Sequence, residues 1–399
     1  MFTRRDWIAG STSTLMLSAL GGARSESSSA ITSAPEDVLV ALPGKKPLIK
    51  RSFRPPNFET PLADLRSPFT ANDAFFVRYH LAAIPEIELR TWRLRVGGAS
   101  TLRALEFSLD DLKHRFERVT LAAVNQCAGN RRGLFIPRVP GVQWGNGAMG
   151  HAMWSGVRLR DILNQCGLRA DALEVVLDGA DGPVLPSTPD FQKSLPVDRA
   201  LDANTLVAFE MNGHPLPHFN GAPARLIVPG WTATYWVKHL TDIRVQPQSF
   251  DGFWMKGAYR IPTGAFPGAR FASQETSETT PITQIMINSL VTSPAPGTQL
   301  KHGRPAELTG WAWDGGTGIS TVEVSTDAGR SWRPAALGKE FGSFAWRGFR
   351  LALDTSHAGT LVLAVRATSR GGERQPEKLT PNPAGYHDNK ILSLALEVV

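Results

Sequence analysis

The sequence predicts an α+β protein in which a mixed α+β domain over residues 35–275 is followed by an immunoglobulin-like β-sandwich over residues 281–399. The chain of 399 residues is longer than one average domain and long enough for two, each with its own core. As far as residue 271, short apolar strands mix with a few amphipathic helices, whereas helical periodicity nearly disappears after Gln274. The polar segment Ser273–Pro281 lies at this change and predicts a linker.

Residues 1–30 predict an export signal rather than a structural helix. A basic start precedes a modest apolar stretch from Ile8 to Leu20, and Thr3–Ile8 fits the twin-arginine pattern. A general secretory signal that contains two arginines is the alternative. No later segment reaches the ~20 apolar residues that a membrane span requires. We therefore expect a soluble protein, exported to the periplasm by the twin-arginine translocase.

The first half of the mature chain predicts an extended arm, two strands and a helix. Ala41–Pro61 is rich in prolines and basic residues, which favours an extended arm. Phe75–Leu81 and Thr91–Gly98 alternate in the manner of strands. Ser108–Phe116 begins with a serine N-cap, continues with acidic residues in its first turn and ends with basic ones, which predicts a short helix.

The segments that follow continue this mixed pattern. Val157–Leu168 predicts a second helix closed by Gly167, and Ala172–Gly182 predicts a strand that leads into an Asp/Gly turn. Ala224–Gly230 and Val237–Gln246 predict a buried strand and an edge strand.

The C-terminal part shows short strands with regular turn signals. The segments are Ala306–Gly316, Ile319–Trp332, Phe344–Leu353, Thr360–Gly372 and Ile391–Val399. This spacing is typical of a sandwich of immunoglobulin-like size.

Charge and cysteine content limit the classes of function. The formal net charge of +7 is moderate and contains no block that resembles a nucleic-acid-binding arm, but a mild positive field suits a small anion. Two cysteines are too few for a disulfide-rich scaffold, although a single Cys127–Cys166 bridge is compatible with export. Because the chain has no CxxC, CxxCH or Cys/His zinc spacing, it predicts neither covalent haem nor structural zinc.

The most informative stretch is Val124–Gly133, where Cys127 follows an apolar run and precedes Arg131 and Arg132. Positive charge favours a thiolate, which is a better nucleophile or metal ligand than a thiol. Small residues after the cysteine let the backbone come close to whatever the sulfur holds. The alternatives are a buried cysteine that acts as a small apolar residue and two solvated arginines.

Asn125–Gly133, "NQCAGNRRG", resembles the molybdenum site of the sulfite oxidase family. Phe75–Leu81, Trp144–Leu163 and Glu210–Gly230 agree with the same family in order and spacing, and Gly310–Trp332 resembles its dimerisation domain. The resemblance covers essentially the whole mature chain.

The resemblance implies a molybdenum centre held by the thiolate of Cys127 and by the dithiolene of one pyranopterin, that is, molybdenum–molybdopterin. Residues 35–275 would then be the catalytic domain. Arg78 and Arg132 would bind a substrate dianion, with His80 close by and Tyr259 hydrogen-bonded near the metal-bound oxygen. The implied cofactor contacts are Phe76, Val77, Arg78, Tyr79, His80, Asp181, Asn220, Arg225, Trp236, Val237 and Lys238.

The chain departs from the family pattern at several positions. Ala258 replaces the usual acidic neighbour of the tyrosine, Pro140 replaces a lysine of the eukaryotic members, and Asn220 replaces a histidine. Trp144 is expected beside the substrate pocket. For an arginine that those members send in from the C-terminal domain, the nearest match is Asn389 or Lys390.

We therefore expect two-electron oxidation of sulfite to sulfate by a homodimer. The chain has no haem or flavin motif, so electrons would leave singly to a separate carrier such as a c-type cytochrome. One alternative on the same scaffold is an S-oxide reductase, and another is a subunit of a sulfur-oxidation complex. A non-enzymatic exported binding protein with a Cys127–Cys166 bridge is a third.

Two further motifs do not carry function. Gly145–Gly150 spells GxGxxG but follows a proline-containing loop, which argues against a dinucleotide site. His214 and His218 have the spacing of a helical metal pair, but Pro215 and Pro217 forbid the helix.

Overall fold

The N-terminal arm forms a small sheet that frames the functional site. In this computed structural model, which describes residues 37–268 and 270–399, the sheet order is β1-β2-β3-β4. Its strands are β1 (Leu39–Ala41), β2 (Pro47–Ser52), β3 (Asn57–Glu59) and β4 (Val77–Arg78). The strand predicted over Phe75–Leu81 is reduced to β4, because only these two residues pair with β3. The arm therefore supports the backbone that carries Arg78.

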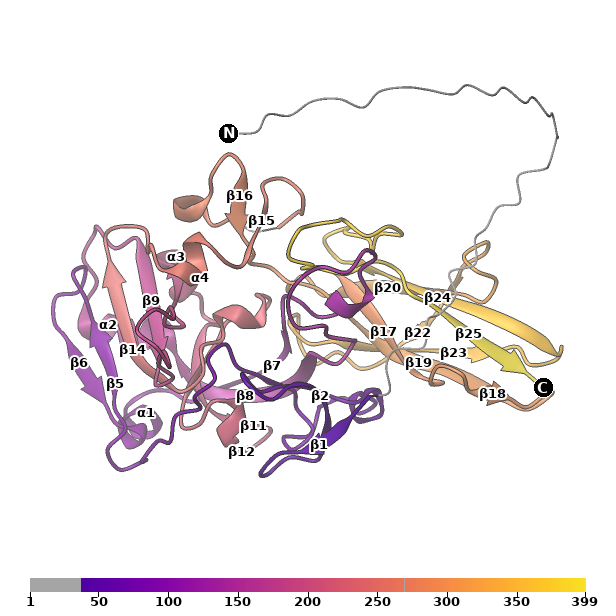
Figure 1. The fold of residues 1–399 in the computed structure, drawn as a ribbon, viewed down its shortest axis with the longest axis horizontal. Coiled ribbons are helices and arrows are strands. Elements are labelled where there is room, and N and C mark those ends of the chain that lie inside the picture. The colour runs from indigo at the N-terminus through magenta and orange to yellow at the C-terminus, as the bar shows by residue number, and fades with distance from the viewer. Residues whose placement is uncertain (1–36, 269) are drawn as a thin grey trace, which may run out of the picture. The chain divides into compact units, whose positions relative to one another are not determined.

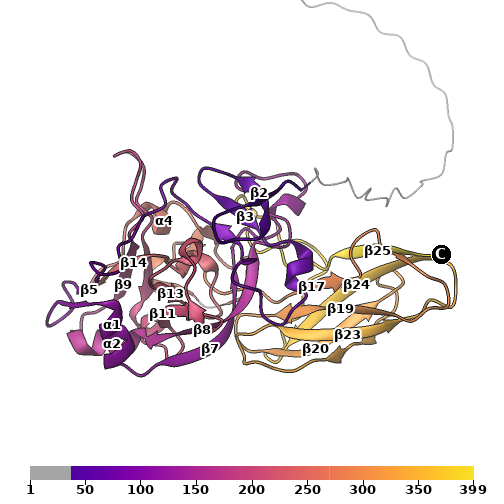
Figure 2. The same ribbon diagram turned by 90° about the horizontal axis from the view of Figure 1, so that it is seen from below.

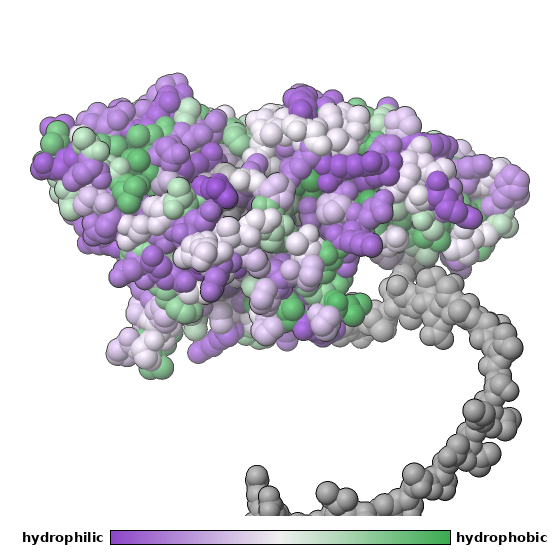
Figure 3. All heavy atoms as spheres, turned by 90° about the horizontal axis from the view of Figure 1, so that it is seen from above, coloured by the Kyte–Doolittle hydropathy of each residue, from purple (hydrophilic) through white to green (hydrophobic). Residues whose placement is uncertain are grey.

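Residues 1–30 lie outside the described residues, so the export signal and the twin-arginine route stay predictions. Val38–Val399 form one compact unit. Among the residues that the structure describes, no helix has the length and apolarity needed to cross a membrane. On the face shown in Figure 3, apolar side chains lie in small separate groups among hydrophilic ones.

Two five-stranded sheets build most of the first part (Figures 1 and 2). The first sheet has the order β10 (Lys193–Pro196), β9 (Glu174–Gly179), β14 (Leu240–Gln246), β5 (Leu94–Gly97) and β6 (Leu105–Phe107). The second has the order β12 (His214–Pro215), β11 (Leu206–Met211), β8 (Met149–Arg158) and β7 (Val119–Gln126), with β13 (Arg225–Ile227) paired to β11. The helices are α1 (Leu109–Arg115), α2 (Leu159–Cys166), α3 (Val197–Ala200) and α4 (Phe253–Lys256).

The helix predicted over Ser108–Phe116 is α1, and its start is set by a capping box. Ser108 Oγ accepts a hydrogen bond from the Asp111 N–H at 3.0 Å, and the Asp111 carboxylate accepts one from the Ser108 N–H at 2.9 Å. The second predicted helix begins two residues later than expected, at Leu159, because Val157 and Arg158 still belong to strand β8.

Strands β7 and β8 place the cysteine motif. They pair antiparallel from Val119–Gly156 to Gln126–Met149, so that β7 ends one residue before Cys127. The Cys127 N–H then donates to the Ala148 carbonyl at 2.9 Å. A long, buried strand pair therefore holds the sulfur at its end, as the apolar run before it predicts.

The C-terminal part consists of two sheets that share a core (Figure 1). One has the order β17 (Asn288–Ser293), β19 (Ala306–Trp313), β23 (Arg347–Leu353) and β22 (Ala336–Leu337). The other has the order β18 (Gln299–Leu300), β25 (Ser393–Val398), β24 (Gly359–Ser369), β20 (Ile319–Ser325) and β21 (Arg333–Pro334). Each predicted strand segment contains a strand, whereas the immunoglobulin-like assignment stays a prediction.

The segment predicted as a polar linker, Ser273–Pro281, is part of the folded structure. Its last residues form β16 (Thr279–Pro281), which pairs antiparallel with β15 (Arg260–Pro262). The Gln274 amide is buried and donates to both carboxylate oxygens of Glu174 at 3.0 Å. The segment therefore pairs with the first part through β16 and through the Gln274 amide, in place of the free polar linker that its composition predicts.

The two parts meet in a shared apolar cluster next to the cysteine motif. Its members are Leu65, Val124 and Met149 from the first part and Ile285, Leu290, Trp311, Trp313 and Trp346 from the second. The Trp313 indole also donates to Gln126 Oε1 at 2.6 Å. The strand end that carries Cys127 is thus packed against the C-terminal part, and the predicted boundary at 275–281 stays a prediction.

Arg131 is a second tie between the parts. Its Nη1 donates to Asn288 Oδ1 at 2.8 Å, its Nη2 to the Ser289 carbonyl at 2.6 Å and its Nε to Asn146 Oδ1 at 2.9 Å. The side chain is 1% exposed, and burial lowers its pKa to about 10. The first arginine of the motif therefore has a structural role that its sequence context did not indicate.

We expect Arg131→Leu to lower the free energy of unfolding by about 2–4 kcal/mol, because buried acceptors lose a charged donor. Urea denaturation followed by tryptophan fluorescence measures this change. Arg138→Leu, at an exposed position of the same loop, is the control and should leave the stability unchanged. Equal stability of the two variants would contradict the structural role.

Candidate functional site

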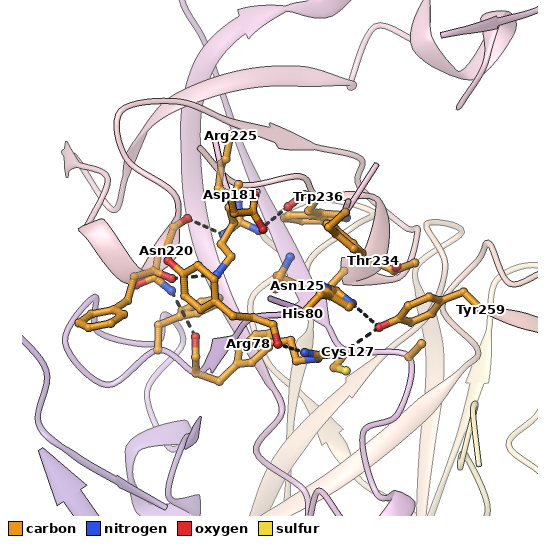
Figure 4. A pocket seen from close by; sticks show the side chains of 18 residues that line it. Arg78, His80, Asn125, Cys127, Asp181, Asn220, Arg225, Thr234, Trp236 and Tyr259 are labelled. Carbon is orange, nitrogen blue, oxygen red and sulfur yellow. Dashed lines mark hydrogen bonds between the residues drawn. The ribbon is translucent and has the colours of Figure 1, made fainter. Parts of the chain in front are cut away.

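A cavity opens beside the end of β7, and residues from several distant segments line it (Figure 4). Its lining residues are Phe75, Phe76, Arg78, Tyr79, His80, Asn125, Cys127, Ala128, Asp181, Phe191, Phe219, Asn220, Arg225, Ala233, Thr234, Trp236, Lys238 and Tyr259. The arm, the cysteine turn and the loops after β9, β13 and β14 thus converge on one space.

Cys127 lies in this cavity as a free thiol that is 6% exposed. Cys166 is also free and lies in the core at the end of α2, where its Sγ–H faces the Val96 carbonyl at 3.7 Å. The alternative in which the two cysteines form a bridge is therefore wrong. The sulfur of Cys127 is therefore available to bind a metal.

Arg132 lies behind the cavity rather than on it. Its Nε donates to the Ala384 carbonyl at 2.8 Å and its Nη1 to the Val142 carbonyl at 3.2 Å. A Cβ at Gly129 would come within 2.5 Å of the guanidinium nitrogens. Gly129 therefore makes room for the Arg132 guanidinium. The sequence had led us to expect instead that the small residues after Cys127 let the backbone approach the ligand of the sulfur.

Arg78, Tyr259 and His80 form one hydrogen-bonded group beside Cys127 (Figure 4). Arg78 Nη2 donates to the Tyr259 hydroxyl at 3.4 Å, and that hydroxyl lies 2.5 Å from His80 Nε2. The imidazole stacks on Phe191, with ring centroids 3.6 Å apart and planes 10° from parallel. The backbone of Tyr259 has φ 58°, a costly left-handed conformation of the kind found at functional sites.

The environment holds both ring systems of this group in their neutral forms. Burial lowers the pKa of His80 well below its ordinary value, and neighbouring cations lower it further. Burial raises the pKa of Tyr259, although the charge of Arg78 opposes the rise. Near neutral pH the group is therefore a protonated phenol beside a neutral imidazole, which can share one proton with a bound oxygen.

Buried cations line the opposite end of the cavity. Arg225 donates to the Asn220 carbonyl at 2.8 Å and to the Trp236 carbonyl at 3.1 Å, and the Lys238 amine lies 2.9 Å from the ring centroid of Tyr79. Burial lowers the pKa of Arg225 to about 9 and that of Lys238 well below its ordinary value. Burial also raises the pKa of Asp181 to about 6. The negative charge of Asp181 interacts with Lys238 and opposes the lowering of the lysine pKa.

Lys45, from the arm, reinforces this end. Its amine donates to Asn220 Oδ1 at 2.5 Å, and the Asn220 amide in turn donates to the Phe76 carbonyl at 3.2 Å. Burial lowers the pKa of Lys45 to about 7. Asn220 is therefore fixed by the protein on two sides.

These features fit a large anionic ligand that offers many hydrogen-bond acceptors. Buried cations are costly unless an opposite charge accompanies them. Three buried polar atoms of residues on the cavity lining also lack a partner among the described residues: Arg225 Nε, Asn125 Nδ2 and Thr234 Oγ1. A pterin with a phosphate supplies both the charge and the acceptors, so the residues present fit the predicted cofactor.

The structure brings together most of the predicted site residues. Phe76, Arg78, Tyr79, His80, Asp181, Asn220, Arg225, Trp236 and Lys238 line the cavity with Cys127 and Tyr259. The side chains of Val77 and Val237 do not: they pack into apolar cores. Val77 differs from its neighbours because successive side chains of a strand face opposite ways. Arg132 is also absent from the lining.

Other predicted positions have different surroundings. Trp144 is fully buried in the main core, and its indole nitrogen has no partner among the described residues. Asn389 donates to the Ile287 carbonyl at 3.2 Å, and Lys390 lies 4.0 Å from Asp388. Neither residue lines the cavity, although they are the nearest match to the arginine that the eukaryotic family members send in from the C-terminal domain. Ala384 and Tyr386 approach the site instead, through Arg132.

The sequence also missed several lining residues. They are Phe75, Asn125, Ala128, Phe191, Phe219, Ala233 and Thr234. A signal existed for Asn125, because a residue two positions before Cys127 shares its face of the strand. Phe191 and Thr234 come from loops whose path no local pattern indicates.

The GxGxxG segment has a structural explanation. The N–H groups of Gly145 and Gly147 donate to the Glu59 carboxylate at 2.8 and 2.7 Å. The rejection of a dinucleotide site agrees with this use of the backbone.

Comparisons with known proteins identify two family models in the chain. Residues 80–254 match the oxidoreductase molybdopterin binding domain, and residues 279–398 match the Mo-co oxidoreductase dimerisation domain. The molybdenum–molybdopterin cofactor that the sequence predicts is thereby confirmed.

The chain is also similar to sulfite oxidases over most of its length. It is 34% identical to the mitochondrial sulfite oxidase of Homo sapiens over 354 residues, which are 85% of this chain and 63% of that protein. It is 32% identical to the sulfite oxidase of Gallus gallus over 362 residues, which are 87% of this chain and 77% of that protein. The chain thus spans less than two thirds of the length of the human protein.

Among solved structures, the sulfane dehydrogenase SoxCD from Paracoccus pantotrophus matches with a TM-score of 0.73 and 26% identity. The match covers 86% of this chain and 85% of that chain.

We expect Lys238→Met to reduce molybdenum and pterin per polypeptide by about tenfold, because a charge-assisted contact worth ~1.5–3 kcal/mol is lost. Metal analysis by mass spectrometry and fluorescence of the oxidised pterin measure the two contents. Lys301→Met, at an exposed position in the C-terminal part, is the control. The apoprotein of the Lys238 variant should be as stable as the wild type or more so, since a buried cation is removed. Unchanged cofactor content would contradict the assignment of this residue.

Proposed function

Because this chain belongs to the sulfite oxidase family of molybdenum oxidoreductases, we propose that it oxidises sulfite to sulfate and passes electrons singly to a separate carrier. The observation that supports this most directly is the convergence of the free Cys127 thiol with the Arg78–Tyr259–His80 group in one cavity (Figure 4). In the overall reaction, sulfite and water yield sulfate, two protons and two electrons.

The residues of the cavity divide into a metal end and a pterin end. Cys127 would hold molybdenum, for which a soft thiolate is a suitable ligand. Arg225, Lys238 and Asn220 would hold the pterin and its phosphate by charge and hydrogen bonds. When bound, the molybdenum cofactor would supply two-electron redox chemistry and the transfer of one oxygen atom to the substrate.

The chain supplies binding and proton handling for this chemistry. Arg78, on the cavity lining, would orient the sulfite oxyanion through its guanidinium fork. Arg132 lies behind the lining and would add positive charge through Nη2, since its Nε and Nη1 donate to the Ala384 and Val142 carbonyls. The Tyr259 hydroxyl holds a proton that it shares with His80 Nε2, 2.5 Å away. The stack of His80 on Phe191 excludes water from one side of this contact and keeps the phenol oriented.

The route and partners that we propose follow the sequence and the family. The twin-arginine pattern supports export to the periplasm. The dimerisation domain matched by residues 279–398 supports a homodimer, with the C-terminal sheets as an immunoglobulin-like sandwich. The electron acceptor that we propose is a c-type cytochrome.

Oxidation of carrier-bound sulfur is the second candidate function, because one of the similar solved structures is a sulfane dehydrogenase. The two candidate functions differ in the size of the substrate. A carrier-bound sulfur atom needs an open approach to the metal, whereas sulfite is a small anion.

We expect the molybdenum-loaded protein to convert sulfite to sulfate with ferricyanide or cytochrome c as acceptor. Ion chromatography of sulfate and spectrophotometry of the acceptor measure the reaction, with parallel assays on a sulfane-carrying peptide and on methionine sulfoxide plus reductant. Turnover of the peptide without turnover of free sulfite would replace our proposal by the second candidate, and sulfoxide reduction alone would make the chain an S-oxide reductase.

Cys127→Ser should give a folded protein with at least about a hundredfold lower kcat, because a hydroxyl is a poor substitute for a thiolate on molybdenum. Circular dichroism checks folding, and steady-state kinetics measure the loss. Cys166→Ser is the matched control and should retain turnover, since that thiol lies in the core. If the Cys127 variant keeps its rate, this thiol does not take part in the reaction.

A further inference from the structure

We propose that Tyr386, which comes from the C-terminal part, is a positioning residue. Its ring fixes the Tyr259 phenol and the Arg132 guanidinium relative to each other at the place where the sulfite anion would bind, which we call the oxyanion subsite. This inference rests on the proposed function, because it assumes that Arg132 and Tyr259 serve the substrate anion. It assigns a role to a residue that the sequence did not single out.

The ring of Tyr386 contacts both groups at once. It lies parallel to the ring of Tyr259, with centroids 5.5 Å apart and planes 13° from parallel. The guanidinium carbon of Arg132 lies 5.2 Å from the centroid of the same ring. Stacking and cation–π contacts of this kind are attractive and directional. Tyr386 therefore links Arg132 to the phenol that contacts His80.

The segment Asn382–His387 is built to hold this ring in place. Asn382 Oδ1 accepts from the Tyr386 N–H at 2.9 Å, and the Asn382 amide donates to the Tyr386 carbonyl at 2.8 Å. The His387 N–H donates to the carbonyl of Ala128, the residue next to Cys127, at 3.2 Å. The ring is 8% exposed. The segment is thus fastened both to itself and to the cysteine turn.

Gly385 lets the segment approach Arg132 closely. Its φ of 61° is a conformation that favours glycine, and a Cβ there would come 2.5 Å from Val139 Cγ2 and 2.9 Å from Arg132 Cγ. The Ala384 carbonyl just before it accepts from Arg132 Nε. Backbone and ring therefore fix the arginine from two directions.

An aromatic ring is a suitable support for an arginine that binds an anion. A carboxylate would neutralise the guanidinium, whereas a ring face orients it and leaves the charge available. Among the described residues, Arg132 Nε and Nη1 donate to the Ala384 and Val142 carbonyls, whereas Nη2 has no hydrogen-bond partner. The N–H groups of Nη2 therefore remain free for an oxyanion.

The electrostatics agree with a common site. Burial raises the pKa of Tyr386, and the neighbouring Tyr259 raises it further, while Arg132 opposes the rise. The phenol of Tyr386 therefore remains neutral beside an anion. Substitution of an ordinary core residue would lower the stability of the protein without a selective effect on the KM for sulfite.

The test compares Tyr386→Leu with Tyr386→Phe in the molybdenum-loaded enzyme. The leucine variant should raise KM for sulfite about tenfold, which corresponds to ~1.4 kcal/mol, and should also lower kcat. The phenylalanine variant keeps the ring and should restore both parameters to within about twofold of the wild type. Tyr386→Met, which refills the volume without a ring face, replaces the leucine variant if that variant does not fold.

Phe116→Leu is the matched control. Phe116 packs edge-on against Phe107, with centroids 5.5 Å apart, and lines no part of the cavity. It should lower stability and leave KM unchanged. Equal KM values for the Tyr386→Leu and Phe116→Leu variants would overturn the proposal. A phenylalanine variant as impaired as the leucine variant would also overturn it, because the hydroxyl and not the ring would then be responsible.

Calorimetric titration with sulfate separates this inference from the proposed function. A wild type that binds sulfate without oxidising sulfite refutes the function, and weaker binding by Tyr386→Leu, about tenfold in Kd, still supports the positioning role. Absence of sulfate binding by the wild type overturns the subsite itself.

Discussion

The cavity around the Cys127 thiol buries more positive than negative charge, and the function of the site depends on this excess of positive charge. Arg225 and Lys238 lie at one end of the cavity and Arg78 at the other, and among the described residues Asp181 is the only carboxylate on its lining. Buried charges of one sign are unfavourable until an anion joins them. The cavity is therefore preorganised for anionic ligands, which agrees with the proposed pterin phosphate at one end and the proposed sulfite at the other.

The fold holds this arrangement by joining distant segments at the end of β7. The strand pair β7–β8 fixes Cys127, the arm supplies Lys45 and the support for Arg78, and the C-terminal part packs against both. Arg131 binds β17, while the segment around Tyr386 contacts Arg132. Consequently, the C-terminal part has a place in the geometry of the site in addition to the dimerisation that its family model indicates.

Local patterns were enough to predict many of these features. The apolar run before Cys127 indicated the strand, Ser108 indicated its helix cap, and each C-terminal strand segment contains a strand. Other features arise only in three dimensions. Arg131 and Arg132 are neighbours of the same residue type, but the backbone at Arg131 is left-handed. The Arg131 side chain therefore bonds Asn288 in the C-terminal part, whereas the Arg132 side chain lies behind the cavity and bonds the Ala384 carbonyl. Gln274 looked like part of a linker because its partner Glu174 is remote in sequence. Tyr386 had no motif that marked it.

The central claim is that the sulfur of Cys127 is a ligand of molybdenum, and X-ray absorption at the molybdenum edge tests it most directly. The molybdenum-loaded Cys127→Ser variant should show one sulfur neighbour fewer than the wild type, with an oxygen or an empty position in its place. The same number of sulfur neighbours in both proteins would contradict the account.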